Sequence, residues 1–431
     1  MNIIIVTHYF EEDGVMGSVR WTEFAYRLSE NHNVLVVTHD NGNRLSENDS
    51  IKIIPIDNEC FYVKRGKVRK FQSISNISNS KRATKTLESG FKDAIKTSLY
   101  FASMNVTAKK NVTTIIDECK KIGFSADAII TSSRPFINCY IGYYFAKKTG
   151  TKWYLDQRDL PFNDNVTLFT INKYKKQFSK FDQYVVKYFF VSNGLAESFF
   201  ENCVANNNQC IKTKMNVLYN GYSCIDDIGE NYERENEALV ITYSGNLYSG
   251  KRDASMLFAA IKKLFSENQY NEKDIAIEYL GDSVSSMIEQ AAYYGLTDLI
   301  EDRGRLPHRE SIRIQKESDM LLLLTWNTKI DKGILTGKFY EYINARKPII
   351  CITSGDIPNG EAADLVNRLN LGIAIDYLNR EQGTQDLYNY IKTQLNRKKI
   401  GEELLYSPNE AMTRYFDYDS LVKKLELLIE T

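Results

Sequence analysis

The chain has 431 residues, which is long for one domain and predicts about two. Its 55 Lys and Arg residues balance 55 Asp and Glu residues, so no overall positive field attracts the protein to nucleic acid. A hydrophobic content of 43% with only 7 prolines is typical of a globular protein and excludes a fibrous or wholly disordered chain.

The seven cysteines include no Cys-x-x-Cys pair, and their odd number argues against a disulfide framework or a zinc ribbon. The first residues, MNIIIVTHYF, lack the basic region of a signal peptide. The longest apolar run, MLLLLTW at 320–326, is too short to span a bilayer. We therefore expect a cytoplasmic protein that can contact the inner face of the cell membrane peripherally.

Short apolar runs alternate with helix-like stretches along the whole chain. They predict strands at 2–8, 33–39, 51–56, 126–133, 152–158, 184–192 and 216–220, and then at 239–246, 275–281, 299–306, 320–326, 347–353 and 371–376. Because these runs are apolar on both faces, they indicate strands buried between helices in parallel sheets. After the first strand, RWTEFAYRL places Trp21, Phe24, Ala25 and Leu28 on one stripe of a helix.

The polar stretch DDIGENYERENEA, residues 226–238, divides the two series of strands. The sequence predicts an α/β protein with two Rossmann-like, doubly wound β/α domains facing a cleft, at residues 1–225 and 226–410. An amphipathic helix in residues 411–431 is expected to pack back towards the N-terminal domain. Ligands of such sheets bind beyond the carboxyl ends of the strands, so the loops there should carry the chemistry.

Three strand–loop–helix junctions pair glycine with a cation. They are EEDGVMGSVRW with Gly14, Gly17 and Arg20, LYSGKRDASM with Gly250, Lys251 and Arg252, and GILTGKFYEYI with Gly337 and Lys338. The N-terminal end of a helix already has a positive dipole, so a cation there is favourable when an anion binds beside it. Together the junctions favour a bound diphosphate, whereas a solvated surface charge explains any one of them.

The junctions do not match G-x-x-x-x-G-K-[ST], and GVMG lacks the G-x-G-x-x-G spacing, which argues against a P-loop NTPase and a nicotinamide dehydrogenase. On the third helix, Phe339, Tyr342 and Ile343 form the predicted buried stripe, and Lys338 and Glu341 share another face. An ionised Glu341 can accept hydrogen bonds from a ribose diol, or it can form a plain surface pair with Lys338.

These motifs resemble GT-B glycosyltransferases of family-four type, and in particular bacterial cell-surface polysaccharide enzymes of the O-antigen or capsule kind. The donor half of the resemblance lies in YSGNLYSGKRDASMLFAAIKKL, RGRLPHRESI, DMLLLLTW and GILTGKFYEYINARKPII. The N-terminal half lies in GVMGSVRWTEFAYRLSENHNVLVVT, TKWYLDQRDL and VLYNGYS. The resemblance covers nearly the whole chain and is weakest across residues 60–125.

The resemblance implies a retaining, metal-independent transferase with no cofactor, which uses a nucleotide-diphosphate sugar as donor. Lys251, Lys338 and the amides of Ile334–Thr336 would hold the diphosphate, and Glu341 would bind the ribose. The expected catalytic residues are Asp159, Lys251 and Glu341. The expected donor-binding residues are Gly14, Gly17, Arg20, Gly245, Asn246, Lys251, Arg252, Ile334, Leu335, Thr336, Lys338 and Glu341, with no metal ligand.

The chain departs from the family pattern at three positions. The first of the family's paired glutamates would stand at position 333, where this chain has Gly333, which leaves the contacts to the sugar hydroxyls open. Asn246 stands where many members have an arginine, and SSRP, which contains Arg134, replaces a frequent histidine. His308, in LPHRE, is expected to start a helix or to lie near the base.

The acceptor, a glycan or a polyprenyl-diphosphate-linked glycan, is expected in the N-terminal domain near Arg134, Asp156 and Arg158. Asp156 or Asp159 could orient the acceptor or act as a base. The alternative is a structural ion-pair cluster of Asp156, Arg158 and Asp159.

Residues 61–110 are locally basic, with twelve Lys or Arg residues against Glu88 and Asp93. Mixed with Phe, Tyr, Leu and Met, these cations predict contact with an anionic membrane, or else a solvated surface segment. Two other functions stay open on the sequence: a nucleotide-sugar epimerase on the same fold, and a non-catalytic nucleotide-sugar-binding protein.

Overall fold

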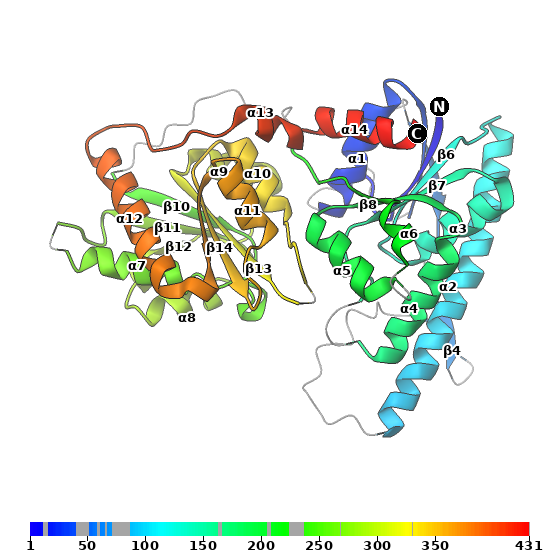
Figure 1. The fold of residues 1–431 in the computed structure, drawn as a ribbon, viewed down its shortest axis with the longest axis horizontal. Helices are drawn as coiled ribbons and strands as arrows, with labels where there is room; N and C mark the ends of the chain where they lie inside the picture. The colour runs from blue at the N-terminus through cyan, green and yellow to red at the C-terminus, as the bar shows by residue number, and fades with distance from the viewer. Residues whose placement is uncertain are drawn as a thin grey trace. The chain divides into compact units, whose positions relative to one another are not determined.

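The computed structural model describes residues 1–11, 16–39, 51–57, 61–64, 67–70, 87–162, 166–204, 208–223, 237–267, 269–329 and 331–430. The chain divides into two compact units, Met1–Tyr219 with Val422–Thr431 (unit 1) and Asn220–Leu421 (unit 2) (Figure 1). The domain boundary expected after residue 225 lies among residues 224–236, outside the described residues.

Unit 1 contains a seven-stranded parallel sheet in the order β3-β2-β1-β6-β7-β8-β9. Its strands are β1 Asn2–Val6, β2 Asn33–His39, β3 Lys52–Ile56, β6 Ala128–Ser132, β7 Lys152–Gln157, β8 Val185–Phe190 and β9 Met215–Val217. Each lies within or beside a run that the sequence predicts as a strand. The sequence analysis did not predict the antiparallel hairpin of β4 Phe61–Lys64 and β5 Lys67–Lys70.

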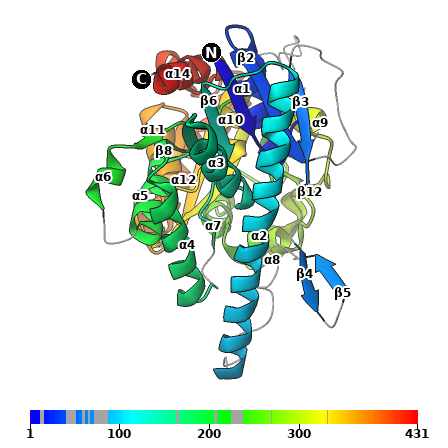
Figure 2. The same cartoon turned by 90° about the vertical axis from the view of Figure 1, so that its right-hand side faces the viewer.

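Helices cover both faces of the unit 1 sheet. They are α1 Met16–Ser29, α2 Leu87–Lys121, α3 Ile137–Thr149, α4 Leu168–Phe181, α5 Asn193–Cys203 and α6 Gln209–Lys212. The predicted stripe of α1 is confirmed, since Trp21, Phe24, Ala25 and Leu28 are fully buried. The end of α14, Tyr418–Glu430, also packs on this sheet, because Tyr154 Oη donates to the Ile429 carbonyl (2.8 Å) and Lys187 Nζ to the Leu428 carbonyl (2.8 Å). α2 is the long helix of Figure 2.

Unit 2 contains a six-stranded parallel sheet in the order β12-β11-β10-β13-β14-β15. Its strands are β10 Leu239–Ser244, β11 Ile275–Leu280, β12 Ile300–Asp302, β13 Met320–Asn327, β14 Ile349–Gly355 and β15 Gly372–Asp376. All six correspond to predicted runs. In chain order this sheet reads 3-2-1-4-5-6, so its topological switch point lies between β10 and β13.

The helices of unit 2 form two layers. They are α7 Ser255–Phe265, α8 Ser285–Ala292, α9 His308–Glu317, α10 Gly337–Ala345, α11 Glu361–Arg368, α12 Arg380–Lys399, α13 Glu410–Thr413 and the start of α14, with short 3₁₀ turns η4 Tyr248–Gly250, η5 Thr297–Leu299, η6 Tyr377–Asn379 and η7 Arg414–Phe416. One face of the sheet packs on α7, α8 and α12, and the other on α9, α10 and α11 (Figure 1).

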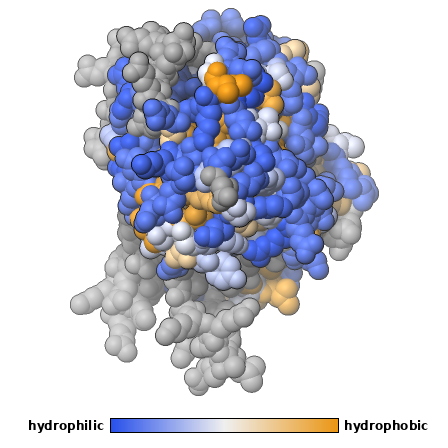
Figure 3. Space-filling model, turned by 90° about the vertical axis from the view of Figure 1, so that its left-hand side faces the viewer, coloured by the Kyte–Doolittle hydropathy of each residue, from blue (hydrophilic) through white to orange (hydrophobic). Residues whose placement is uncertain are grey.

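The side of the molecule in Figure 3 is mostly hydrophilic, and its hydrophobic side chains form small separate patches. Hydrophobic side chains scattered in this way are ordinary on protein surfaces. Among the described residues, no helix combines the length and the apolar character needed to cross a bilayer.

Candidate functional site

The switch point of unit 2 collects the loops that follow β10 and β13. Tyr342 of α10 connects the two strands, because its hydroxyl accepts from the Ser244 amide of β10 (3.1 Å) and donates to the Leu322 carbonyl of β13 (3.3 Å). Phe339 and Ile343 are buried beside it, as the helical spacing predicts. The start of α10 is therefore held against the carboxyl edge of the sheet, where ligands of this architecture bind.

The start of α10 presents a row of backbone N–H groups with no acceptor among the described residues. Gly337 begins the helix, and its N-cap residue Thr336 makes no side-chain capping bond. The amides of Ile334, Leu335, Thr336, Gly337 and Lys338 make no hydrogen bond to the described part of the chain. Free amides at the positive end of a helix dipole form an anion-binding arrangement.

Glu341 is a buried carboxylate behind these amides, with 8% of its surface exposed. Lys338 Nζ (2.8 Å) and Gln315 Nε2 (2.9 Å) donate to its Oε2. Burial alone would raise the pKa of Glu341, but its interactions with His308, Lys338 and Gln315 outweigh burial and lower the pKa to about 2. The group is thus a carboxylate at every physiological pH.

The second oxygen of Glu341 is available to a ligand. Oε1 is buried and accepts no hydrogen bond in this structure, and His308 Nε2 lies 3.6 Å from it, beyond hydrogen-bond distance. A buried acceptor without a donor is costly, and a ligand hydroxyl would satisfy it.

The residues that support Glu341 come from α9, and of these only His308 was a candidate on the sequence; Ser311 and Gln315 were not. Gln315 Nε2 also donates to Ser311 Oγ (3.2 Å), which in turn lies 3.2 Å from Ser244 Oγ of β10. His308 is the first residue of α9, which agrees with the prediction that it starts a helix. The helical spacing of His308, Ser311 and Gln315 puts them on one face, which was the available signal.

Lys251 lies in the loop after β10, and half of its side-chain surface is exposed. Its ammonium group is 3.3 Å from Asp331 Oδ2 and 5.3 Å from the centre of the Trp326 ring. Trp326 lies near the end of β13 and Asp331 lies in the loop after it, so Lys251 spans the switch point. The side chain is accessible to an anion.

Arg252, Gly245 and Asn246, three of the expected donor-binding residues, shape this loop. Arg252 is only 6% exposed and donates to the Asn246 carbonyl (2.8 Å) and the Tyr243 hydroxyl (3.3 Å). Gly245 has a φ of 138°, in a region that favours glycine. The Asn246 amide group exchanges hydrogen bonds with Asp282 (3.2 and 3.1 Å), which ties the loops after β10 and β11 together.

In unit 1, Arg20 and Asp156 form a buried ion pair. Arg20 lies in the second turn of α1, and its guanidinium is buried against Asp156 (2.8 Å) and the carbonyls of Leu218 (3.0 Å) and Tyr219 (2.7 Å). Trp21 Nε1 donates to the same carboxylate (2.9 Å). With exposures of 1% and 0%, neither charged group is accessible to a donor or an acceptor, and their role is to join α1 to the sheet.

The other unit 1 candidates lie nearer the surface. Asp159 pairs with Arg134 (3.3 Å) and keeps 61% of its side chain exposed, so it remains accessible to an acceptor. Arg158 donates to the Gly17 carbonyl (3.1 Å) and so ties the end of β7 to the start of α1. Gly14 lies outside the described residues. In place of the alternative cluster of Asp156, Arg158 and Asp159, Asp156 pairs with Arg20 and Asp159 pairs with Arg134.

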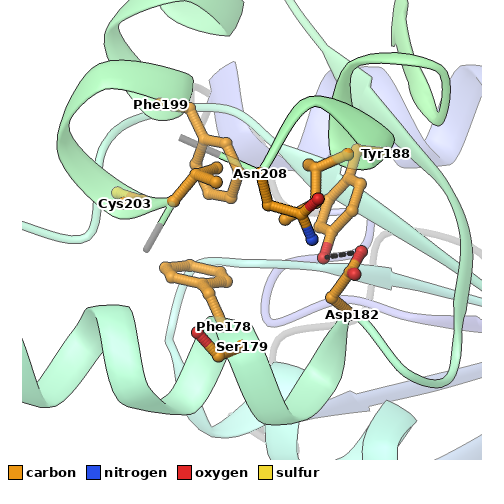
Figure 4. Close-up of a pocket in the computed structure, with 9 residues that line it drawn as sticks. Phe178, Ser179, Asp182, Tyr188, Phe199, Cys203 and Asn208 are labelled. Carbon is orange, nitrogen blue, oxygen red and sulfur yellow. Dashed lines mark hydrogen bonds between the residues drawn. The ribbon is translucent and has the colours of Figure 1, made fainter. Parts of the chain in front are cut away.

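A cavity of about 70 Å³ lies elsewhere in unit 1, between α4, α5 and β8 (Figure 4). Phe178 and Phe199 line it, and Tyr188 Oη donates to Asp182 Oδ1 (3.4 Å) at its edge. Asp182 and Asn208 precede β8 and β9, so the cavity is beside the amino ends of these strands. That is the opposite edge from the one where ligands of such sheets bind.

Solved structures of GT-B glycosyltransferases share the fold of this chain. Anabaena HepE, solved in complex with UDP, is 12% identical with a TM-score of 0.63, and the alignment covers 100% of both chains. Sucrose-phosphate synthase from Thermosynechococcus elongatus is 11% identical with a TM-score of 0.62, covering 99% of this chain and 98% of that one. The lipopolysaccharide outer core galactosyltransferase WaaB is 14% identical with a TM-score of 0.57, covering 100% and 99%.

No protein-family model and no curated protein matches the sequence. At these identities the likeness defines the fold, and the chain has the two parallel α/β domains of the GT-B class.

Proposed function

We propose that the protein is a glycosyltransferase that transfers a sugar from a nucleotide-diphosphate sugar to a glycan or lipid-linked acceptor. The observation that carries this proposal is the switch point of unit 2. There, unbonded amides at the start of α10, the accessible Lys251 and the unsatisfied oxygen of Glu341 lie on connected elements. One ligand with an anionic group and a vicinal diol satisfies all three, and a nucleoside diphosphate has both.

In this proposal, Glu341 accepts hydrogen bonds from the ribose, and its fixed negative charge suits a neutral diol rather than a phosphate. The diphosphate lies against the amides of residues 334–338 and near Lys251. Lys338 is paired with Glu341 at 2.8 Å and balances that charge, so Lys251 is the main cation for the diphosphate.

Departure of the nucleoside diphosphate places negative charge on its terminal phosphate. Preorganised amides and Lys251 stabilise that charge in the transition state more than in the ground state, which lowers the barrier without a metal ion. We infer retention of anomeric configuration and metal independence from the resemblance to family-four enzymes. Asp159, exposed on unit 1, is the proposed acceptor-side residue.

We place the reaction in bacterial surface polysaccharide synthesis, with UDP-sugars as the first donors to test. HepE was solved with UDP, and WaaB is described as a lipopolysaccharide galactosyltransferase. Both share the fold of this chain over its full length.

A lipid-linked acceptor requires contact with the membrane, and we propose that α2 provides it. Ile95, Leu99 and Val106 are exposed hydrophobic residues on one stripe of this helix, and Lys96 and Lys109 are exposed beside them. The hairpin strand β4, which pairs with the basic strand β5, lies beside α2 (Figure 2). Flotation with phosphatidylglycerol vesicles should recover the protein at low salt and less of it at high salt; no recovery at low salt would refute this contact.

The function is tested by incubating the protein with UDP-, GDP-, dTDP- and CMP-sugars and measuring release of the nucleotide. We expect slow release with one donor, lost in Lys251→Ala and in Glu341→Ala but retained in Asp364→Asn, which removes an exposed pair with Arg368 on α11. An isomerised sugar without acceptor would instead identify an epimerase. Tight binding without turnover for any acceptor would identify a binding protein.

A further inference from the structure

Four side chains surround the outer end of the switch point, and the proposed nucleotide contacts do not use all of them. This rim consists of Tyr248, Lys251, Trp326 and Asp331. The Tyr248 and Trp326 rings are 5.9 Å apart at 54°, and the Lys251 ammonium lies over Trp326 and against Asp331.

The backbone of Tyr248 is strained. Its φ is 48°, which is rare for an aromatic residue, and 56% of the residue is exposed. The Arg252 guanidinium lies 4.6 Å from the ring centre and supports the side chain from the loop. Backbone strain at a residue that is more than half exposed is typical of ligand sites.

Asp331 is a carboxylate beside a predicted anion site, where it would repel a phosphate. Its contacts to described side chains fall on Oδ2, which receives Trp326 Nε1 (3.3 Å) and Lys251 Nζ (3.3 Å). The backbone fixes it as well, since the Asp331 amide donates to Thr328 Oγ1 (3.1 Å). Oδ1 is left for a neutral donor group, and the carboxylate side chain is 25% exposed.

A sugar ring has the groups that this rim can bind. Its hydroxyls donate to a carboxylate, and its C–H face packs on an aromatic ring. Asp331 lies on the segment between β13 and the start of α10, and Lys251 contacts its carboxylate, so the rim adjoins the loop whose amides would hold the phosphate. A sugar attached to that phosphate would reach the rim.

We propose that Tyr248, Trp326 and Asp331 form the donor-sugar subsite, with Asp331 accepting from the sugar hydroxyls. This inference rests on the proposed function and adds to it the residues that distinguish a nucleotide sugar from the bare nucleotide. It also assigns a carboxylate to the sugar in a chain that has Gly333 where related sequences have glutamate.

The test compares the Kd of UDP and of UDP-glucose, and of GDP and GDP-mannose, by calorimetry on the full chain. In Asp331→Asn, the preference for the sugar nucleotide over the bare nucleotide should fall at least tenfold while the nucleotide Kd changes less than threefold. Tyr248→Gly should lower the same preference and leave the melting temperature unchanged or higher, because glycine relieves the positive φ. Tyr293→Ala, at an 85% exposed tyrosine on another surface, is the matched control and should alter neither.

If Asp331→Asn weakens the affinity for the bare nucleotide and for the sugar nucleotide by the same factor, the subsite is overturned, because Asp331 would then only position Lys251 for the diphosphate. Unchanged preference in both variants would overturn it too. If the wild-type chain binds none of these four ligands and no nucleotide sugar of the dTDP or CMP class, the proposed function itself is refuted, a result distinct from the other two.

Discussion

The charge of Glu341 should make a measurable, pH-dependent contribution to folding. Its ordinary pKa of 4.5 falls to about 2 in the folded protein. A difference of about 2.5 at 1.36 kcal/mol per unit corresponds to about 3 kcal/mol of stability at neutral pH. Since the folded pKa is depressed, this stability is present above pH 4.5 and is lost as the pH falls towards 2.

Glu341→Gln removes the charge with little change of shape, and we expect it to lower the free energy of unfolding by about 3 kcal/mol at pH 7 and by roughly half as much at pH 3. Equilibrium urea unfolding followed by circular dichroism, repeated between pH 3 and 7, measures this difference. The control, Asp364→Asn, removes an exposed pair and should change stability by less than about 1 kcal/mol at every pH. A Glu341→Gln deficit that is below about 1 kcal/mol, or that does not shrink at low pH, would refute the assigned interactions.

Two further predictions concern the unit 1 fold. Arg20→Ala leaves Asp156 buried without its partner and should lower the free energy of unfolding by about 3–5 kcal/mol. The double variant Arg20→Met with Asp156→Leu should recover part of that loss. An Arg20→Ala variant of native stability would contradict the structural role of this pair. A Cβ at Gly142 would overlap the Trp153 indole, so Gly142→Ala should cost about 1–3 kcal/mol despite its better helix propensity. The control is Gly123→Ala, at a position with a φ of 68° and open space around it, which should cost about 1 kcal/mol from backbone strain alone. Thermal unfolding measures both variants. A Gly142→Ala variant as stable as the wild type would show that α3 can move away from Trp153.

The sheets could be predicted from the sequence because each buried strand is an apolar run that local inspection finds. The stripe of α10 and the pairing of Lys338 with Glu341 follow from helical spacing alone. The hairpin β4–β5 could not be predicted in this way because half of the residues in its two strands are lysine or arginine, so neither strand forms an apolar run.

The partners that charged residues find far along the chain could not be predicted. Arg20 finds Asp156 at a separation of 136 residues, and no local pattern distinguishes this buried pair from a phosphate-binding arginine. Gln315 reaches Glu341 across 26 residues, and Lys251 reaches Asp331 across 80. Such pairings depend on which helices and loops the topology brings together, and that information is absent from any single stretch of the chain.

Ligand-induced stabilisation tests the central claim most directly. A ligand that binds only the folded state raises stability by about 2.7 kcal/mol at 100 times its Kd. In a thermal-unfolding panel of UDP-, GDP-, dTDP- and CMP-sugars, we expect one nucleotide class to raise the melting temperature of the wild-type protein and of Asp364→Asn. The same ligand should have little effect on Lys251→Ala and Glu341→Ala. If no nucleotide sugar stabilises the wild type, or if the two site variants respond as strongly as it does, the switch point of unit 2 is not a nucleotide-sugar site.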